Sequence, residues 1–334
     1  MPEENLQVVL ASRPTGWVNE SNFRIVETPI PAAGDGQVLV KSLYLSLDPY
    51  MRGRMNDSRS YAAKVEIGQV MTGEAVSEVV QSKNPQFKAG DVVLSRGGWQ
   101  RYALSDGSDL RKVDPKAVPI STYLGVVGMP GVTAWVGLND IGQPKPGETV
   151  VVSAASGAVG SVVGQLAKAR GCRVVGVAGG REKCDFVTKE LGFDACIDHR
   201  SGDLVKALAA AAPKGIDIYF ENVGGPLLDA VLALCNPFAR IPLCGMVSQY
   251  NAGDDRYGVK NLMAAVGMRI KLQGFIVSDH LNRWPEALKE LSEGVRSGKI
   301  KYRETVTQGL ENAPRAFIGL LKGENFGKQV VKVA

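Results

Sequence analysis

Short runs of β-branched residues alternate with helical patterns along the second half of the chain. Residues 149–152 form a run that is typical of a buried parallel strand. Residues 161–170 have the pattern of a helix that ends at Gly171, and a second strand-like run follows at once. Together they predict one βαβ unit. Six strands are predicted in this region, at 149–153, 173–178, 195–197, 216–220, 240–244 and 271–275, and they indicate a doubly wound parallel sheet.

The flanking regions have a different pattern. Up to about residue 120, short β-type runs such as 37–45 and 90–95 are separated by turn residues, which predicts an antiparallel β domain. Residues 121–141 have a helical pattern with an interruption at Pro130-Gly131, and 143–147 predict the turn into the first parallel strand. An amphipathic helix is predicted at 284–297 and a strand at 329–333. We therefore expect an N-terminal β domain (1–120), an α/β domain (121–295) and a C-terminal return (296–334) that packs on the β domain.

A glycine-rich turn, Ala155-Ser156-Gly157-Ala158-Val159-Gly160, separates the first predicted strand from its helix. Backbone N–H groups at the start of that helix can hold a pyrophosphate, because the helix dipole and the unpaired donors both point there. Ala155 stands where a dinucleotide fingerprint usually has its first glycine, and a Cβ is tolerated there if φ stays negative. Such glycines can also form a simple tight turn. The strand–helix–strand context favours dinucleotide binding.

The end of the second predicted strand indicates which dinucleotide. An NAD-binding unit usually places Asp or Glu about twenty residues past the glycines, to bind the ribose diol. Here the sequence is Ala178-Gly179-Gly180-Arg181-Glu182-Lys183, with no acid at the strand end and two cations beyond it. Space and positive charge suit a 2′-phosphate, so NADP(H) is favoured. The alternative is that the two cations are only solvated residues at the start of a helix.

Composition narrows the function classes. The 334 residues suit two domains, and a net charge of +5, with acids interleaved among the bases, argues against nucleic acid as principal partner. No apolar stretch is long enough to span a bilayer, and residues 1–5 have no secretory signal pattern, so we expect a cytoplasmic protein that does not insert into membranes. Five cysteines without a C-x-x-C pair suit reduced thiols. The first half of the chain has neither Cys nor His, so we expect no zinc site.

Longer motifs resemble one family over essentially the whole chain. The sequence is similar to zinc-free medium-chain dehydrogenases/reductases, in the group of leukotriene hydroxydehydrogenases, prostaglandin reductases, plant alkenal double-bond reductases and bacterial curcumin reductase. The stretch at 196–200 is most similar to the curcumin reductase branch. The resemblance implies a GroES-like antiparallel β domain for substrate and catalysis beside a Rossmann domain for NADPH. The motifs that carry it are LYLSLDPYMRGRM (43–55), GMPGVTAWVGL (128–138), AASGAVGSVVGQLAK (154–168), ENVGG (221–225), CGMVSQYN (244–251) and LLKGENFGKQVVKV (320–333).

The resemblance also implies which residues meet the cofactor. Lys183 matches the cation that holds the 2′-phosphate, whereas His199 departs from the family, because animal relatives have a Tyr there. The pyrophosphate turn matches Gly157, Ala158, Val159 and Gly160, and Gly179 opens the space beside it. The remaining cofactor contacts match Asn222, the loop with Cys244, Gly245, Ser248 and Tyr250, the segment Phe275, Ile276 and Val277, and Asn325.

The reaction implied is reduction of a carbon–carbon double bond conjugated to a carbonyl, in a small enone or enal. Negative charge develops on the carbonyl oxygen, so a donor must point at it. Tyr250 is the first candidate and Tyr50 the second, because a Tyr keeps its proton at neutral pH. Either could instead serve packing or a backbone hydrogen bond. Candidate substrate contacts are Tyr50, Met51, Arg52 and Trp99, with core packing or an ion pair to an acid as the alternative.

Three other functions are compatible with parts of the pattern. A zinc-free NADPH quinone oxidoreductase would share the fold and differ in the pocket, and the motifs at 43–55 and 244–251 argue against it. An NADPH-binding regulatory protein would bind without turnover, and alcohol oxidation is disfavoured by the missing zinc ligands. The family also implies a homodimer, and the apolar stretch at 271–277 could supply an exposed sheet edge for it.

Overall fold

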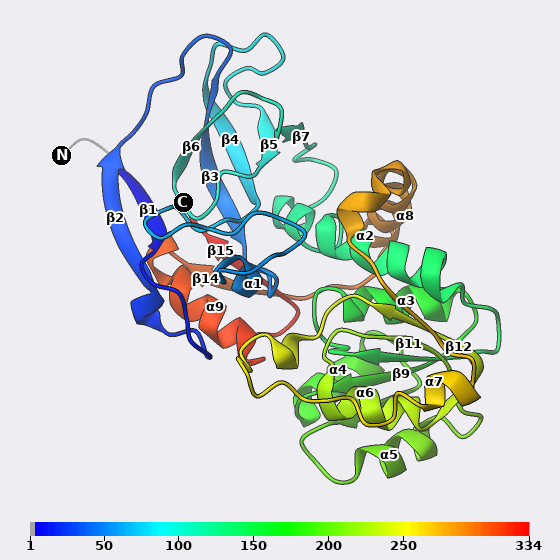
Figure 1. The fold of residues 1–334 in the computed structure, drawn as a ribbon. Helices are drawn as coiled ribbons and strands as arrows, with labels where there is room; N and C mark the ends of the chain where they lie inside the picture. Colours follow the sequence, from blue (N-terminus) through cyan, green and yellow to red (C-terminus); the bar gives the residue numbers. More distant parts are fainter. Residues whose placement is uncertain (1–3, 334) are drawn as a thin grey trace. The chain divides into compact units, whose positions relative to one another are not determined.

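The computed structural model describes residues 4–333. No secretory signal is expected at residues 1–5, and the first three of these residues lie outside the described part of the chain. The chain divides into two compact units (Figure 1). Unit 1 comprises the residues up to Leu124 together with those from Glu304 onward, and unit 2 is Gly125–Arg303. The expected boundaries at 120 and 295 stay predictions of domain extent.

Unit 1 is built on a twisted sheet with the order β14-β15-β3-β4-β5-β7, and β6 also pairs with β3. A separate hairpin pairs β1 with β2. All of these pairs are antiparallel except β14 with β15, which are parallel. The strands are β1 (Glu4–Leu10), β2 (Phe23–Pro29), β3 (Val38–Ser46), β4 (Ala75–Ser82), β5 (Val92–Ser95), β6 (Tyr102–Ser105), β7 (Arg111–Lys112), β14 (Glu304–Gln308) and β15 (Lys328–Lys332), with short helices η1 (Glu20–Asn22), α1 (Met51–Arg54), η2 (Ile120–Leu124), η6 (Leu310–Asn312) and α9 (Ala313–Leu321).

A buried ion pair joins the C-terminal strand to the turn that follows β3. The Lys328 ammonium lies 3.1 Å from the Asp48 carboxylate, and both side chains are almost fully buried. The same ammonium donates to the Leu47 carbonyl at 2.6 Å. Since a buried charge is tolerated only when it is paired and hydrogen-bonded, these contacts hold β15 against the segment that leads to Tyr50.

Unit 2 contains a six-stranded parallel sheet with the order β10-β9-β8-β11-β12-β13. The order reverses between β8 and β11, which confirms the doubly wound sheet. Most of β8 and β9 is fully buried, as the β-branched runs predict. The strands are β8 (Thr149–Ser153), β9 (Arg173–Ala178), β10 (Ala195–Asp198), β11 (Ile216–Phe220), β12 (Cys235–Leu243) and β13 (Lys271–Gly274).

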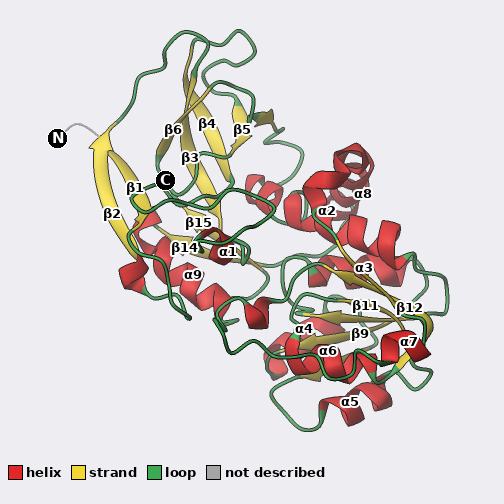
Figure 2. Cartoon of the chain, in the orientation of Figure 1, coloured by secondary structure: helices red, strands yellow, loops and turns green. Residues whose placement is uncertain are grey.

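Helices cover both faces of this sheet (Figure 2). On one face lie α2 (Met129–Val136), α3 (Gly160–Ala169) and α8 (Trp284–Arg296), and on the other lie α5 (Leu204–Ala211), α6 (Gly225–Leu232) and α7 (Ala264–Gly267). The remaining helical segments of this unit are η3 (Gly137–Gly142), α4 (Arg181–Lys189), η4 (Val247–Gln249) and η5 (Val277–Arg283).

The prediction of an interrupted helix over 121–141 is wrong in one respect. Pro130 does not break a helix but stands in the first turn of α2, where its missing N–H costs nothing. The interruption falls at 125–128, between η2 and α2. Gly131 is required there, because a Cβ would come within 1.9 Å of the Val126 carbonyl oxygen.

Candidate functional site

The six parallel strands end at the same edge of the unit 2 sheet, and the loops that follow them carry most of the predicted cofactor contacts. The turn at 154–160 follows β8, and Gly179 follows β9. Asn222 comes after β11 and Cys244 after β12. Ligands of doubly wound sheets bind at this edge, close to the point where the strand order reverses.

The glycine-rich turn leads from β8 directly into α3. The Gly157 N–H donates to the Ala154 carbonyl at 2.9 Å, and a Cβ on Gly160 would lie only 2.4 Å from the same oxygen. Ala155 fits because its neighbour on β9 is Gly176, where a Cβ would come within 2.8 Å of the Ala155 Cβ. The φ of Ala155 is not positive, as expected, although that of Ala154 is 49°. The turn therefore leaves the α3 N-terminus open to an anion.

A cluster of cationic side chains surrounds the turn after β9. A Cβ on Gly179 would lie 3.0 Å from His199 Nε2 and 3.1 Å from Arg200 Nε. Burial lowers the pKa of the Lys183 ammonium, and the positive charge of the nearby Arg200 lowers it further. Asp198 fixes the backbone here, since its carboxylate accepts from the N–H groups of Gly180 and Arg200 at 2.9 and 3.0 Å. We call Lys183, His199 and Arg200 the cation cluster.

Arg200 is not among the residues predicted from the sequence, because no local pattern marks it. The parallel pairing of 195–198 with 175–178 places it here by bringing the ends of β10 and β9 together. The departure at His199 thus leaves Lys183 and Arg200 as the charged members of the cluster. Burial, and then Arg200, lowers the pKa of the His199 imidazole, so this ring is predominantly neutral at pH 7. It can still donate a hydrogen bond or stack.

The loops after β11 and β12 are joined by hydrogen bonds. The Ser248 hydroxyl donates to the Val223 carbonyl at 2.6 Å, and the Val247 N–H donates to the Asn222 carbonyl at 3.0 Å. The Tyr250 hydroxyl folds back over Gly245, where a Cβ would lie 2.9 Å from it, and accepts a long hydrogen bond of 3.4 Å from the Met246 N–H. Burial, and then Glu221, raises the pKa of the Cys244 thiol to about 12, so this residue is not a nucleophile at neutral pH.

A buried carboxyl that the sequence analysis overlooked supports Asn222. Glu221 is fully buried at the end of β11, and its Oε1 accepts from the Tyr219 hydroxyl at 2.9 Å and the Val223 N–H at 2.6 Å. Ser153 lies between this carboxyl and Asn222, whose N–H donates to the Ser153 hydroxyl at 2.8 Å. Burial raises the pKa of Glu221. In the sequence, this buried carboxyl is marked by an acidic residue that directly follows a predicted buried strand.

Phe275, Ile276 and Val277 follow β13. The Phe275 ring packs edge-on against Phe220, with centroids 6.4 Å apart, and close to Gly137. Asn325 lies in unit 1, where its side chain donates to the Gly327 carbonyl at 2.7 Å. The cofactor contacts expected of these four residues stay predictions.

Tyr50 lies in unit 1, in the turn between β3 and α1. The ring is half-buried, and the Arg54 guanidinium lies 5.5 Å from its centroid. Burial first, and then the negative charges of Asp48 and Glu74, raises the pKa of the Tyr50 hydroxyl. The same surroundings raise the pKa of Glu74 to about 7, again chiefly through burial. Tyr50 is therefore held as a protonated donor throughout the physiological range.

The other proposed substrate contacts lie deeper in unit 1. Met51 and Trp99 are fully buried, and the Trp99 ring stacks on Phe23 at 5.6 Å. Arg52 is 3% exposed and donates to the Gly16 carbonyl at 2.8 Å and to Asn56. These positions match the core alternative for Met51 and Trp99, and they give Arg52 structural hydrogen bonds to Gly16 and Asn56. Their substrate roles stay predictions.

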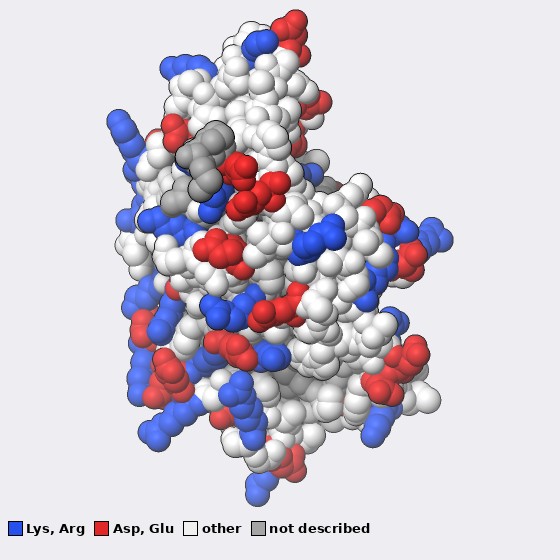
Figure 3. Space-filling model, turned by 90° about the vertical axis from the view of Figure 1, so that its left-hand side faces the viewer, with Lys and Arg blue, Asp and Glu red and all other residues white. Residues whose placement is uncertain are grey.

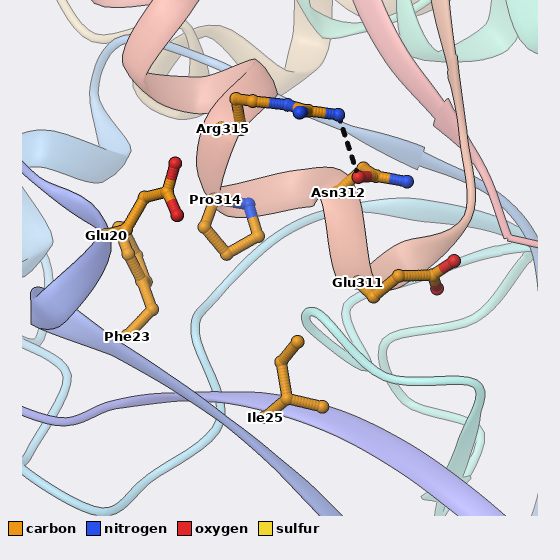
Figure 4. Close-up of a pocket in the computed structure, with 7 residues that line it drawn as sticks. All are labelled: Glu20, Phe23, Ile25, Glu311, Asn312, Pro314 and Arg315. Carbon is orange, nitrogen blue, oxygen red and sulfur yellow. Dashed lines mark hydrogen bonds between the residues drawn. The ribbon is translucent and has the colours of Figure 1, made fainter.

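A shallow hollow on unit 1 involves other residues. Figure 4 shows it between η1 and β2 on one side and η6 and α9 on the other, with Arg315 donating to Asn312 at 3.0 Å. It is lined by Glu20, Phe23, Ile25, Glu311, Asn312, Pro314 and Arg315, none of which is a predicted site residue.

Residues 4–333 show no sign of two other kinds of site. No three His, Cys, Asp or Glu side chains of this part lie together as a metal would need. No helix within it has the length and apolar character needed to cross a bilayer. On the face drawn in Figure 3, acidic and basic side chains are interspersed.

Comparison with known proteins identifies the family. Residues 6–113 match the family model described as the N-terminal domain of oxidoreductase, and 158–293 match the one described as zinc-binding dehydrogenase. The chain is 56% identical to an NADPH-dependent curcumin reductase of Escherichia coli, over 99% of this chain and 98% of that protein. It is 45% identical to a 2-alkenal reductase (NADP(+)-dependent) of Nicotiana tabacum, over 100% and 99% of the two chains.

The chain belongs to the zinc-independent medium-chain dehydrogenase/reductase family. The solved structure of CurA from Vibrio vulnificus in complex with NADPH is 51% identical and superposes with a TM-score of 0.95, over 98% and 99% of the two chains. The Escherichia coli quinone oxidoreductase complexed with NADPH is 20% identical over 98% and 99%, with a TM-score of 0.78, which shows a shared fold alone. The expected family and the fold class, a GroES-like β domain with a Rossmann domain, are thereby confirmed.

The contact between Ala155 and Gly176 gives a test of the turn. Gly176→Ala should destabilise the protein by about 1–3 kcal/mol, because the new Cβ would overlap the Ala155 Cβ and the Val187 Cγ1. Adding Ala155→Gly removes one of the two overlaps and should restore part of the loss in urea unfolding. Strictly additive losses in the double variant would contradict this account of the turn.

Proposed function

We propose that this protein is an NADPH-dependent reductase of the carbon–carbon double bond in α,β-unsaturated ketones and aldehydes. The proposal rests on sequence identity over essentially the whole chain. The chain is 56% identical to an enzyme named as a curcumin reductase and 45% identical to one named as a 2-alkenal reductase. Curcumin-like enones, alkenals and oxo-lipids are the substrate classes that fit. The cation cluster supplies an independent argument for the cofactor.

The residues present fit NADPH. Gly157 and Gly160 leave the α3 N-terminus free of side chains, so its N–H groups can hold the pyrophosphate. The space at Gly179, which a Cβ would fill against His199 and Arg200, lies among cations and not beside a ribose-binding acid. Lys183 and Arg200 would hold the 2′-phosphate there, and Asn222, Gly245 and Phe275–Val277 would line the nicotinamide side.

When bound, NADPH supplies a hydride to the β-carbon of the substrate. The protein must stabilise the enolate oxygen that forms and keep water away from it. Tyr250 is the first candidate donor, directly or through the ribose hydroxyl, since its hydroxyl lies beside Gly245 in the loop that follows β12. Tyr50 is the second, because its raised pKa keeps the proton in place.

A quinone oxidoreductase is the alternative, and turnover separates the two. We would follow NADPH oxidation with an alkenal, curcumin and a simple quinone, each repeated with NADH. The proposal predicts turnover of the enones to saturated carbonyl products with a clear preference for NADPH. Turnover of the quinone alone would contradict it.

We also propose a cytoplasmic homodimer that joins at the edge strand β13. This strand ends the sheet, and α7 immediately before it carries apolar side chains on the surface. Met263 and Val266 are 78% and 74% exposed, and Leu262 and Phe238 are also exposed. An unpaired edge beside apolar side chains favours pairing with another copy. The cytoplasmic location is supported by the five cysteines, which are all free thiols.

The cation cluster predicts cofactor discrimination. Lys183→Ala and Arg200→Ala should each raise the KM for NADPH by about 10- to 100-fold and leave the KM for NADH nearly unchanged, because each loses one charged hydrogen bond to the 2′-phosphate. Lys189→Ala, at the exposed end of the same helix, is the matched control. Equal changes for both cofactors would remove the residue from the 2′-phosphate site.

The two tyrosines can be separated by steady-state kinetics. Tyr250→Phe should lower kcat by about 10- to 100-fold with little change in the KM for NADPH, because the lost donor acts only on the developing enolate. Tyr50→Phe tests the second candidate, and Tyr257→Phe, whose hydroxyl donates to Asp229, is the control. If only Tyr50→Phe loses turnover, the donor is Tyr50.

The proposed interface predicts the mass in solution. The chain weighs 35.6 kDa, and light scattering should give twice that value. Val266→Asp should yield monomers, because it places a charge in the apolar contact. Val205→Asp, on exposed α5, should not. A Val266→Asp protein that stays dimeric would place the interface elsewhere.

A further inference from the structure

Two cysteines lie side by side next to the cation cluster. Cys184 stands in the first turn of α4, and Cys196 lies on β10. Their sulfur atoms are 2.6 Å apart, and both residues are free thiols. A disulfide needs 2.03–2.05 Å between the sulfurs. Little movement therefore separates this pair from a covalent bond.

The pair is also placed for reaction with a small oxidant. Both residues are half-buried, unlike Cys172 and Cys235, which are buried. The Cys196 thiol donates to the Cys184 sulfur. This hydrogen bond points the donated proton at the Cys184 sulfur, so it supports a thiolate at Cys184 and opposes the rise in the pKa of Cys184 that burial causes.

We propose that Cys184 and Cys196 form a reversible disulfide on exposure to a peroxide. The Cys184 thiolate attacks one peroxide oxygen, which gives a sulfenic acid and, after protonation of the leaving hydroxide, one water. The Cys196 sulfur then attacks the Cys184 sulfur, so that the S–S bond forms and the S–O bond breaks. The hydroxide that leaves takes the Cys196 proton as a second water. Two thiols are oxidised and one peroxide is reduced to two waters.

The bond would join the two segments that carry the cation cluster. Lys183 is the neighbour of Cys184, while His199 and Arg200 follow Cys196 by three and four residues. Asp198 already connects these segments through the N–H of Gly180. The crosslink therefore fixes α4 against the end of β10 in nearly its present arrangement. The crosslink would thereby organise the 2′-phosphate site before the cofactor binds, an effect that rests on the proposed function.

The test begins with the reduced, purified protein. After treatment with hydrogen peroxide and removal of the oxidant, the intact mass should fall by two hydrogen atoms, and a non-reduced digest should contain the peptide pair linked through Cys184 and Cys196. Dithiothreitol should reverse both changes. Cys184→Ser and Cys196→Ser should each abolish the linked pair, and Cys172→Ala should retain it.

Thermal unfolding and kinetics of the same samples complete the test. The crosslink should raise the melting temperature by about 5 °C or more, because it closes a short loop in the unfolded chain. The KM for NADPH should fall by about twofold to fivefold, with that for NADH unchanged.

Sulfinic acid at either residue in place of the crosslink, a bond to another cysteine, or a lower melting temperature would overturn the disulfide. An unchanged or raised KM for NADPH, or parallel changes with NADH, would overturn its link to the 2′-phosphate site. The mass readout needs no turnover, so failure of the reductase assignment would be seen separately.

Discussion

The arrangement of the candidate site depends on one constraint, the meeting of the carboxyl ends of parallel strands at a single edge of a sheet. Because the strands of unit 2 are parallel, each must be followed by a crossover before the next strand can start in the same direction. The glycine turn after β8, the cation cluster after β9 and β10, and the joined loops after β11 and β12 are brought together only by this topology. No two of these segments are neighbours in the sequence, and hydrogen bonds from Asp198, Ser153 and Ser248 then fix their positions.

Much of the α/β unit could be predicted from local pattern. The strands at 149–153, 173–178 and 216–220 were placed to the residue, because buried β-branched runs bounded by turn residues are a strong local signal. The helix at 284–297 was placed to within one residue for a similar reason, since its apolar face repeats with a helical period. Pro130 was misread because a proline in a helix-like pattern looks the same whether it ends a helix or begins one.

Fewer features of the candidate site could be predicted from the sequence, because several of its contacts depend on which strands and helices pair. Lys183 could be found because it follows the glycine turn at a regular distance, whereas Arg200 could not, since its place depends on which strand pairs with β9. The contact between Cys184 and Cys196 likewise depends on how α4 packs on β10. Trp99 has two glycines before it, a pattern compatible with a pocket wall, and only the packing of Phe23 and Phe317 on its ring places it in the core. Local patterns identify candidates, and tertiary pairing decides which of them meet.

The central claim is that the protein reduces a carbon–carbon double bond by transfer of a hydride from NADPH to the β-carbon of the substrate. The most direct test is turnover of an α,β-unsaturated ketone with NADPH deuterated at the transferable position, followed by NMR of the product. The account predicts a saturated ketone with deuterium at the β-carbon and solvent hydrogen at the α-carbon. Deuterium at the carbonyl carbon of an unsaturated alcohol, or no transfer to the enone while a quinone is reduced, would contradict it.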